Sequence, residues 1–162
     1  MAKSEFLQIR VTPAQKAGLR RLATAAGEDL SSYVLARALP AARLRFEELV
    51  DALGDGADHR FVLAELNDLL SGLAGSEMTV ATVDADLGPL SPFLANYVAA
   101  MVEQAAGAKG VAPPAWTSRV APLELPYFAA PMRALRPHLL RSAPIPFKRR
   151  NLFVDATVGA RV

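Results

Sequence analysis

The chain has 162 residues, of which 52% are hydrophobic and 21% charged, so it can bury a core and is not expected to be disordered throughout. It contains no cysteine, which excludes a disulfide framework, a thiol nucleophile and a thiolate zinc site. No stretch of about 18 apolar residues suits a membrane span, and the N-terminus lacks a signal-peptide pattern. The sequence predicts a soluble, cytoplasmic protein with no metal and no cofactor.

Charge is distributed unevenly along the chain, although the formal net charge is only +2. Basic residues outnumber acidic ones in residues 1–40 and in residues 104–162, whereas acidic residues dominate residues 41–103. This pattern indicates basic ends that contact acidic partners or fold back on the acidic middle. An ordinary solvated surface with uneven local charge is the alternative.

The first predicted element is a half-buried strand, because Leu7, Ile9 and Val11 alternate with Phe6, Gln8 and Arg10. A capping box, Thr12 to Gln15, then predicts a helix from Pro13 to about Ala26. Gly27 ends this helix.

A second short helix is predicted after the N-cap candidates Asp29 to Ser32, and Pro40 ends it. One strand and two short helices cannot form a domain alone, because the strand has no partner for its backbone groups. Two copies of the strand that pair antiparallel under four helices solve this problem. Residues 1–40 are therefore predicted to form a dimeric module.

The segments that carry a family resemblance are Leu7–Pro13, Ala25–Gly27 and Leu30–Val34. They resemble the ribbon-helix-helix proteins of the Arc, MetJ and CopG class, and are particularly similar to TacA-type antitoxins. The resemblance implies a homodimer formed through the N-terminal strand, which binds operator DNA.

A two-stranded ribbon fits the major groove of DNA, so the outward side chains of the strand are the candidate base contacts. Arg10 suits guanine, Gln8 suits adenine and Phe6 suits a thymine methyl group. Lys3 and the free amides of Ser32 and Tyr33 are candidate phosphate contacts. A dimerisation strand that never touches DNA is the alternative.

Residues 41–110 are predicted to form a small helical bundle. Its helices run from Ala41 to Leu53, from Asp58 to Gly72 or Gly75, and onwards from Ser91-Pro92. The fold class is thus mainly α, with an N-terminal ribbon-helix-helix, this bundle and an extended, proline-rich C-terminal segment.

Residues 113–146 contain eight of the twelve prolines, so residues 111–162 are predicted to be extended and basic. Pro137 is expected to break any helix that begins near Met132. Such a segment wraps the bundle or binds another protein.

The motifs Pro113–Trp116, Leu125–Phe128 and Phe147–Asp155 are similar to small bacterial proteins encoded beside AbiEii-like nucleotidyltransferase toxins. This resemblance implies that the carboxyl half neutralises a toxin. The candidate partner contacts are aromatic and basic side chains: Trp116, Tyr127, Phe128, Phe147, Lys148, Arg149, Arg150 and Phe153. Anchoring of the aromatic residues to the protein's own bundle is the alternative.

One pattern suggests an enzyme. Gly75-Ser76 followed by Asp84 and Asp86 imitates the phosphate turn and the magnesium-binding carboxylates of nucleotidyltransferases. Met78–Val83 would be the required strand. The preferred interpretation is a capped helix with surface acids, because such short patterns often arise by chance.

The predicted function is therefore a non-enzymatic type II antitoxin, which represses its own operator as a dimer and neutralises a partner toxin, for which a nucleotidyltransferase is the candidate. A stand-alone ribbon-helix-helix regulator with a ligand-sensing or oligomerisation domain is the alternative. A small nucleotidyltransferase is the less favoured one.

Overall fold

The structure is a computed structural model that describes residues 8–38, 40–56, 58–130 and 132–155. Its elements are mostly helices, with one two-stranded sheet. In chain order they are α1 (Pro13–Ala26), α2 (Leu30–Ala38), α3 (Ala41–Gly54), α4 (His59–Gly72), α5 (Gly75–Ala81), α6 (Pro92–Ala108), the 3₁₀ turn η1 (Thr117–Arg119), β1 (Tyr127–Phe128), the 3₁₀ turn η2 (Arg133–Leu135), α7 (Arg136–Ser142), α8 (Ile145–Lys148) and β2 (Leu152–Phe153). The prediction of a mainly α protein is confirmed.

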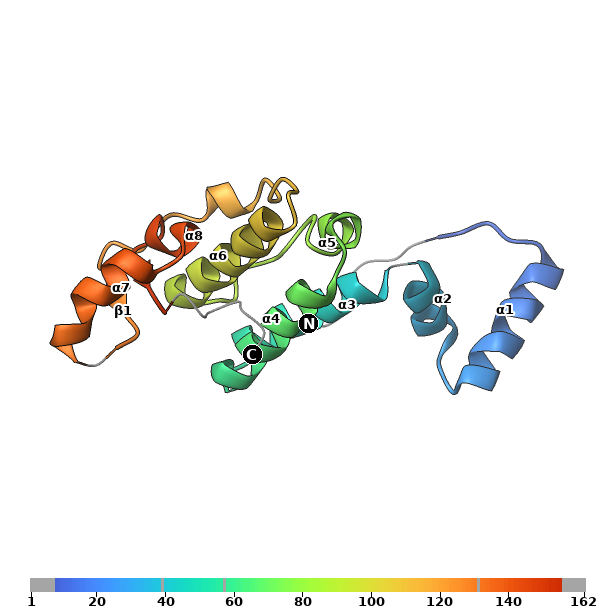
Figure 1. The fold of residues 1–162 in the computed structure, drawn as a ribbon. Helices are drawn as coiled ribbons and strands as arrows, with labels where there is room; N and C mark the ends of the chain where they lie inside the picture. The colour runs from blue at the N-terminus through green and yellow to red at the C-terminus, as the bar shows by residue number, and fades with distance from the viewer. Residues whose placement is uncertain (1–7, 39, 57, 131, 156–162) are drawn as a thin grey trace.

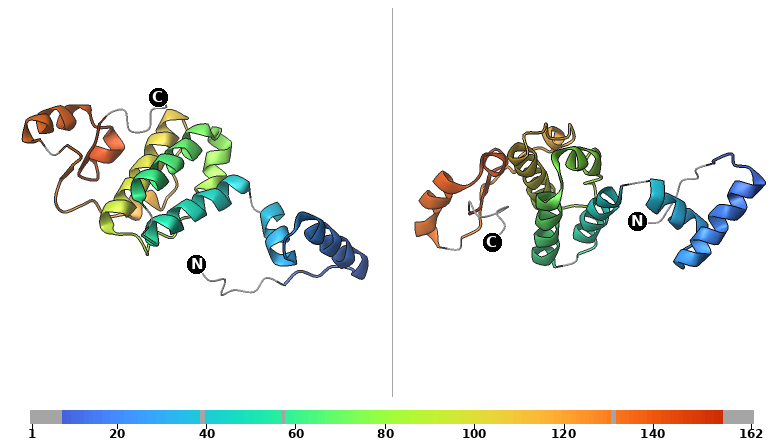
Figure 2. Two further views of the ribbon diagram at one scale, coloured as in Figure 1. Left: turned by 90° about the horizontal axis from the view of Figure 1, so that it is seen from below. Right: turned by 45° about the vertical axis from the view of Figure 1, so that its right-hand side comes forward.

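The two N-terminal helices pack against each other and lie apart from the rest of the described chain (Figure 1). Two further views show the same separation (Figure 2). Ala23 of α1 and Tyr33 of α2 are the buried apolar residues here, and neither joins the main hydrophobic core. The N-terminal helices therefore have only a small interior of their own in one chain.

Helix α6 is the centre of the larger part of the molecule. It packs against α4, α8 and η1, and one whole side of it is buried, including Val98 and Val102. Side chains from distant segments complete this core: Phe46 of α3, Leu66 of α4 and Phe147 of α8 are fully buried. Helices α3 to α6 and α8 thus share a single hydrophobic core.

The strongest helix starts follow the caps expected from the sequence. Asp58 accepts a hydrogen bond from the Arg60 amide at the start of α4, and Ser91 accepts one from the Leu94 amide at the start of α6. These side chains satisfy amides that have no partner inside the helix. The three bundle helices predicted within residues 41–110 are confirmed, and α5 is an additional one.

The C-terminal segment differs from the prediction, because it is only partly extended. It contains η1, η2, α7 and α8, and Leu152 and Val154 are buried in the core. Pro137 is the second residue of α7, which begins directly after the 3₁₀ turn η2, so no single helix runs from near Met132 through this proline. A proline in the first helical turn removes an amide that would have had no partner in any case.

The short sheet closes the C-terminal segment onto itself. Strands β1 and β2 are parallel, with Tyr127 opposite Leu152 and Phe128 opposite Phe153. Asn151, at a left-handed φ of 58°, turns the chain into β2, and its side-chain amide donates to the Leu123 carbonyl at 2.6 Å. This hydrogen bond connects Asn151 with Leu123, which lies 28 positions earlier in the chain.

Candidate DNA-binding and partner-binding surfaces

The predicted DNA-contacting residues Gln8 and Arg10 come just before the start of α1, and a capping box defines that start. The Thr12 hydroxyl accepts from the Gln15 amide at 3.3 Å, and the Gln15 side chain accepts from the Thr12 amide at 2.9 Å. This reciprocal pair, followed by Pro13 at the first helical position, is the predicted capping box. Gln8 and Arg10 therefore precede a well-defined helix start.

Residues 8–12 are exposed and have no regular structure in the single chain. Ile9 is 60% exposed and Val11 41%, and Leu22 on α1 is 54% exposed. Exposed aliphatic side chains close together are typical of an interaction surface. The predicted strand stays a prediction, and of its candidate residues Lys3, Phe6 and Leu7 lie outside the described residues.

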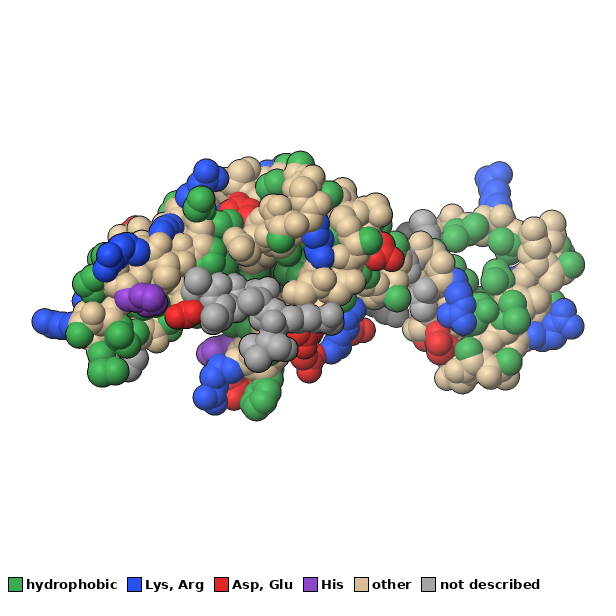
Figure 3. Space-filling view, in the orientation of Figure 1, with side chains coloured by type: hydrophobic (Ala, Val, Ile, Leu, Met, Phe, Trp, Pro, Cys, Tyr) green, Lys and Arg blue, Asp and Glu red, His purple; other side chains and the backbone are tan. Residues whose placement is uncertain are grey.

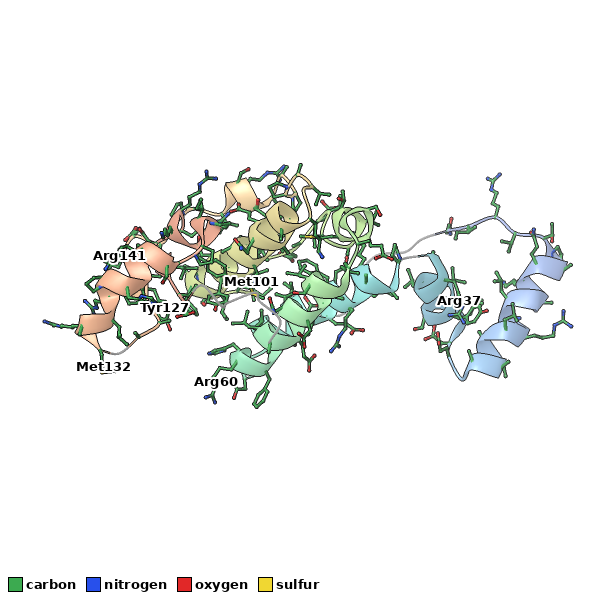
Figure 4. The ribbon with its side chains drawn as sticks, viewed as in Figure 1. Arg37, Arg60, Met101, Tyr127, Met132 and Arg141 are labelled. Carbon is green, nitrogen blue, oxygen red and sulfur yellow. The ribbon has the colours of Figure 1, made fainter. Side chains whose placement is uncertain are left out.

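The N-terminus of α2 differs from the expectation of free amides. The Asp29 carboxylate accepts from the Ser32 amide at 3.0 Å, and the Asp29 carbonyl accepts from the Tyr33 amide at 2.9 Å. Both amides are therefore occupied, and a phosphate would have to displace the Asp29 cap. On the next turn, Arg37 stacks over the Tyr33 ring at 4.6 Å (labelled in Figure 4).

Two of the candidate partner contacts, Phe147 and Arg150, are buried, and a third, Trp116, packs half-buried against the core. Phe147 is fully buried and its ring meets Tyr97 edge-on at 5.3 Å. Burial in this aromatic cluster raises the pKa of the Tyr97 phenol. The Trp116 indole donates to the Thr82 carbonyl at 2.8 Å, and Arg150 is only 5% exposed. In this conformation Phe147 and Arg150 are buried, and Phe147 and Trp116 are anchored to the protein's own bundle, as the alternative interpretation expects for aromatic residues.

Arg150 is the centre of a polar cluster that the sequence interpretation missed. Its guanidinium group donates to Glu103 at 2.6 Å and to the Thr117 carbonyl at 2.7 Å, with longer contacts to Asn96 and the Val120 carbonyl. Glu103 is the only charged residue of α6. A lone carboxylate in an apolar helix is the signal that predicts a buried cationic partner.

The other candidate contacts lie towards the surface. The Phe128 and Phe153 rings stack at 4.8 Å, and the Arg136 guanidinium lies over Phe128 at 4.9 Å. Tyr127 is 41% exposed. Lys148 donates to the Arg141 carbonyl at 2.8 Å, and Arg149 is exposed.

The segment that imitates a nucleotidyltransferase is helical. Gly75-Ser76 opens α5, where Glu77 accepts from the Ala74 amide, and no strand leads to Asp84 and Asp86. The described part of the chain contains no group of three or more metal-ligating side chains. Nor does any helix in it combine the length and the apolar composition of a membrane span.

A comparison with known families finds a match in the N-terminal part of the chain. Residues 6–52 match the family model described as "Antitoxin TacA 1-like". The match runs from the segment before α1 through α2 and most of α3. The resemblance to TacA-type antitoxins is confirmed, and the match supports an antitoxin of a toxin–antitoxin system. No curated protein and no solved structure matches the chain. The resemblance to proteins encoded beside AbiEii-like toxins stays a prediction.

Proposed function

We propose that this protein is a dimeric antitoxin that represses its own operator through residues 1–40 and neutralises a toxin through the remainder of the chain. The observation that carries the proposal is the TacA-like match over residues 6–52. The exposure of Ile9, Val11 and Leu22 supports the homodimer, because a second copy of the same segment would cover all three.

The DNA contacts follow from the position of the strand. If Leu7, Ile9 and Val11 face the helices of a dimer, Gln8 and Arg10 face outwards with period two. Both types of side chain form bidentate hydrogen bonds with base edges in the major groove. We assign sequence reading to these two residues. A phosphate contact is assigned to Lys3, and the Ser32 and Tyr33 amides are not assigned one because Asp29 occupies both.

The test uses a labelled duplex from the region upstream of the gene, with binding followed by fluorescence anisotropy at fixed salt. Replacing Arg10 by Ala is expected to weaken specific binding by about 1–3 kcal/mol, because one base pair loses its bidentate contact. The matched control is Arg20→Ala, which removes an exposed arginine on α1. Equal affinities of the wild type and Arg10→Ala for the operator would overturn the assignment.

The toxin is proposed to be the protein encoded next to this one, with nucleotidyltransferase activity. Co-expression tests the first part: growth arrest by the neighbouring protein alone, and normal growth with both, is the expected result. Incubation of the purified neighbour with labelled nucleoside triphosphates and Mg²⁺ tests the second. A neighbour that neither arrests growth nor binds this chain would refute the antitoxin function.

A further inference from the structure

The end of the molecule formed by β1, η2, α7 and the start of α8 carries an unusual number of exposed apolar side chains. Six of the twelve exposed large hydrophobic residues in the described chain come from this stretch of 21 residues. They are Leu125, Tyr127, Met132, Leu135, Leu140 and Ile145. We call this set the terminal patch. Exposed apolar side chains gathered in this way mark an interaction surface rather than a solvated one.

The same end of the molecule is strongly basic. Between Leu125 and Val154 there are six Lys and Arg residues and no acidic residue. Arg150 is buried with Glu103, whereas Arg133, Arg136, Arg141 and Arg149 have no carboxylate within 4.0 Å among the described residues. Figure 3 shows basic and hydrophobic side chains together at this end, and Figure 4 places Met132 and Arg141 there, at the opposite end from Arg37.

We propose that the toxin docks on the terminal patch, through a protein surface with an apolar centre and an acidic rim. This inference rests on the antitoxin function proposed above. The inference leaves out two of the candidate toxin contacts predicted from the sequence, because Phe147 and Arg150 are buried. The residues that remain available are those around α7.

The composition of the patch favours a protein over a nucleic acid. Phosphate groups would pair with the arginines but would leave Leu125, Leu140 and Ile145 exposed to water. A protein interface buries aliphatic and aromatic side chains at its centre and places complementary charge at its edge. The terminal patch has both components, which requires acidic side chains on the partner.

The experiment measures binding of the full-length chain to the neighbouring-gene protein by biolayer interferometry. Ile145→Glu and Arg133→Glu are expected to weaken binding at least about tenfold each, because they put negative charge on a surface that meets an acidic rim. The matched controls are Phe61→Glu on α4, where Phe61 is 72% exposed, and Arg21→Glu on α1. The controls are expected to bind like the wild type. Circular dichroism melting verifies that each variant is folded.

The outcomes separate the two proposals. If the wild type binds the neighbour and the patch variants bind equally well, the terminal patch is wrong and the antitoxin function stands. If the wild type does not bind the neighbour, both fail. If the variants lose affinity for a random DNA duplex while they retain the neighbour, the patch is a nucleic-acid surface and the inference is overturned.

Discussion

Arg150 connects three parts of the chain through one guanidinium group. Glu103 lies on α6, Thr117 lies in η1, and Arg150 itself follows α8. The Nε atom has no hydrogen-bond partner, so the group is well but not completely satisfied. A buried ion pair of this kind holds segments in one arrangement, because separation of the partners leaves an uncompensated charge.

Replacing Arg150 by Ala is expected to lower the free energy of unfolding by about 3–5 kcal/mol, because the partly buried Glu103 loses its cation and the Thr117 carbonyl loses its donor. Urea denaturation followed by circular dichroism measures the loss. Arg149→Ala is the matched control, since Arg149 is the exposed neighbour in the chain, and its effect is expected within about 0.5 kcal/mol. Similar losses for both variants would contradict the structural role of the Arg150 cluster.

The basic triplet shows what a sequence can and cannot predict at this scale. Lys148, Arg149 and Arg150 look equivalent in the chain, yet one caps a carbonyl of α7, one is exposed and one is buried. The burial of Arg150 depends on α6 and η1, which lie more than 25 residues away in the sequence. The residues next to Arg150 in the sequence do not indicate these distant contacts.

At the scale of elements, helices with local start signals were predictable. Three helices begin directly after a residue whose side chain accepts a hydrogen bond from an amide of the first turn. These capping residues are Thr12 for α1, Asp58 for α4 and Ser91 for α6. Helices α5, α7 and α8 have at most seven residues, so their stability comes from packing rather than propensity. Pro137 lies at the start of α7 and Pro146 at the start of α8, and sequence alone does not say which side of a proline is helical.

The cap of α1 carries a prediction. Thr12→Ala removes one half of the capping box and is expected to destabilise α1 by about 1 kcal/mol, which accelerates hydrogen exchange at the Gln15 amide. Thr24→Ala is the control, because the Thr24 hydroxyl only donates back to the Arg20 carbonyl inside the helix. Exchange measured by NMR should change at Gln15 in the first variant alone. Unchanged exchange there would show that the box contributes nothing.

For the whole molecule, the core extends beyond residues 41–110. Phe147, Leu152 and Val154 are buried in one cluster with residues of α3, α4 and α6. Hydrophobic patterning identified the α3, α4 and α6 contributions, but it left open whether the proline-rich segment packs on this bundle or binds another protein. The amount of apolar surface on α6, which is buried on nearly every turn, was the available signal.

This shared core predicts the effect of truncation. A chain that ends at Gly110 loses the side chains that cover α6, so it is expected to bind the dye ANS and to lose cooperative thermal unfolding. A chain that ends at Asp155 keeps every described core residue and is expected to unfold cooperatively, like the full chain. Calorimetry distinguishes the two. Cooperative unfolding of residues 1–110 would mean that the C-terminal segment is dispensable to the core.

The position of these covering residues near the end of the chain has a consequence for synthesis in the cell. Helices α3 to α6 leave the ribosome before Phe147, Leu152 and Val154 have been translated. At about 5–20 residues per second, residues 111–155 take about 2–9 s to make, and the apolar side of α6 is uncovered during that time. A chain whose translation stops before Phe147 is therefore expected to expose its apolar interior to proteases, which the completed chain covers.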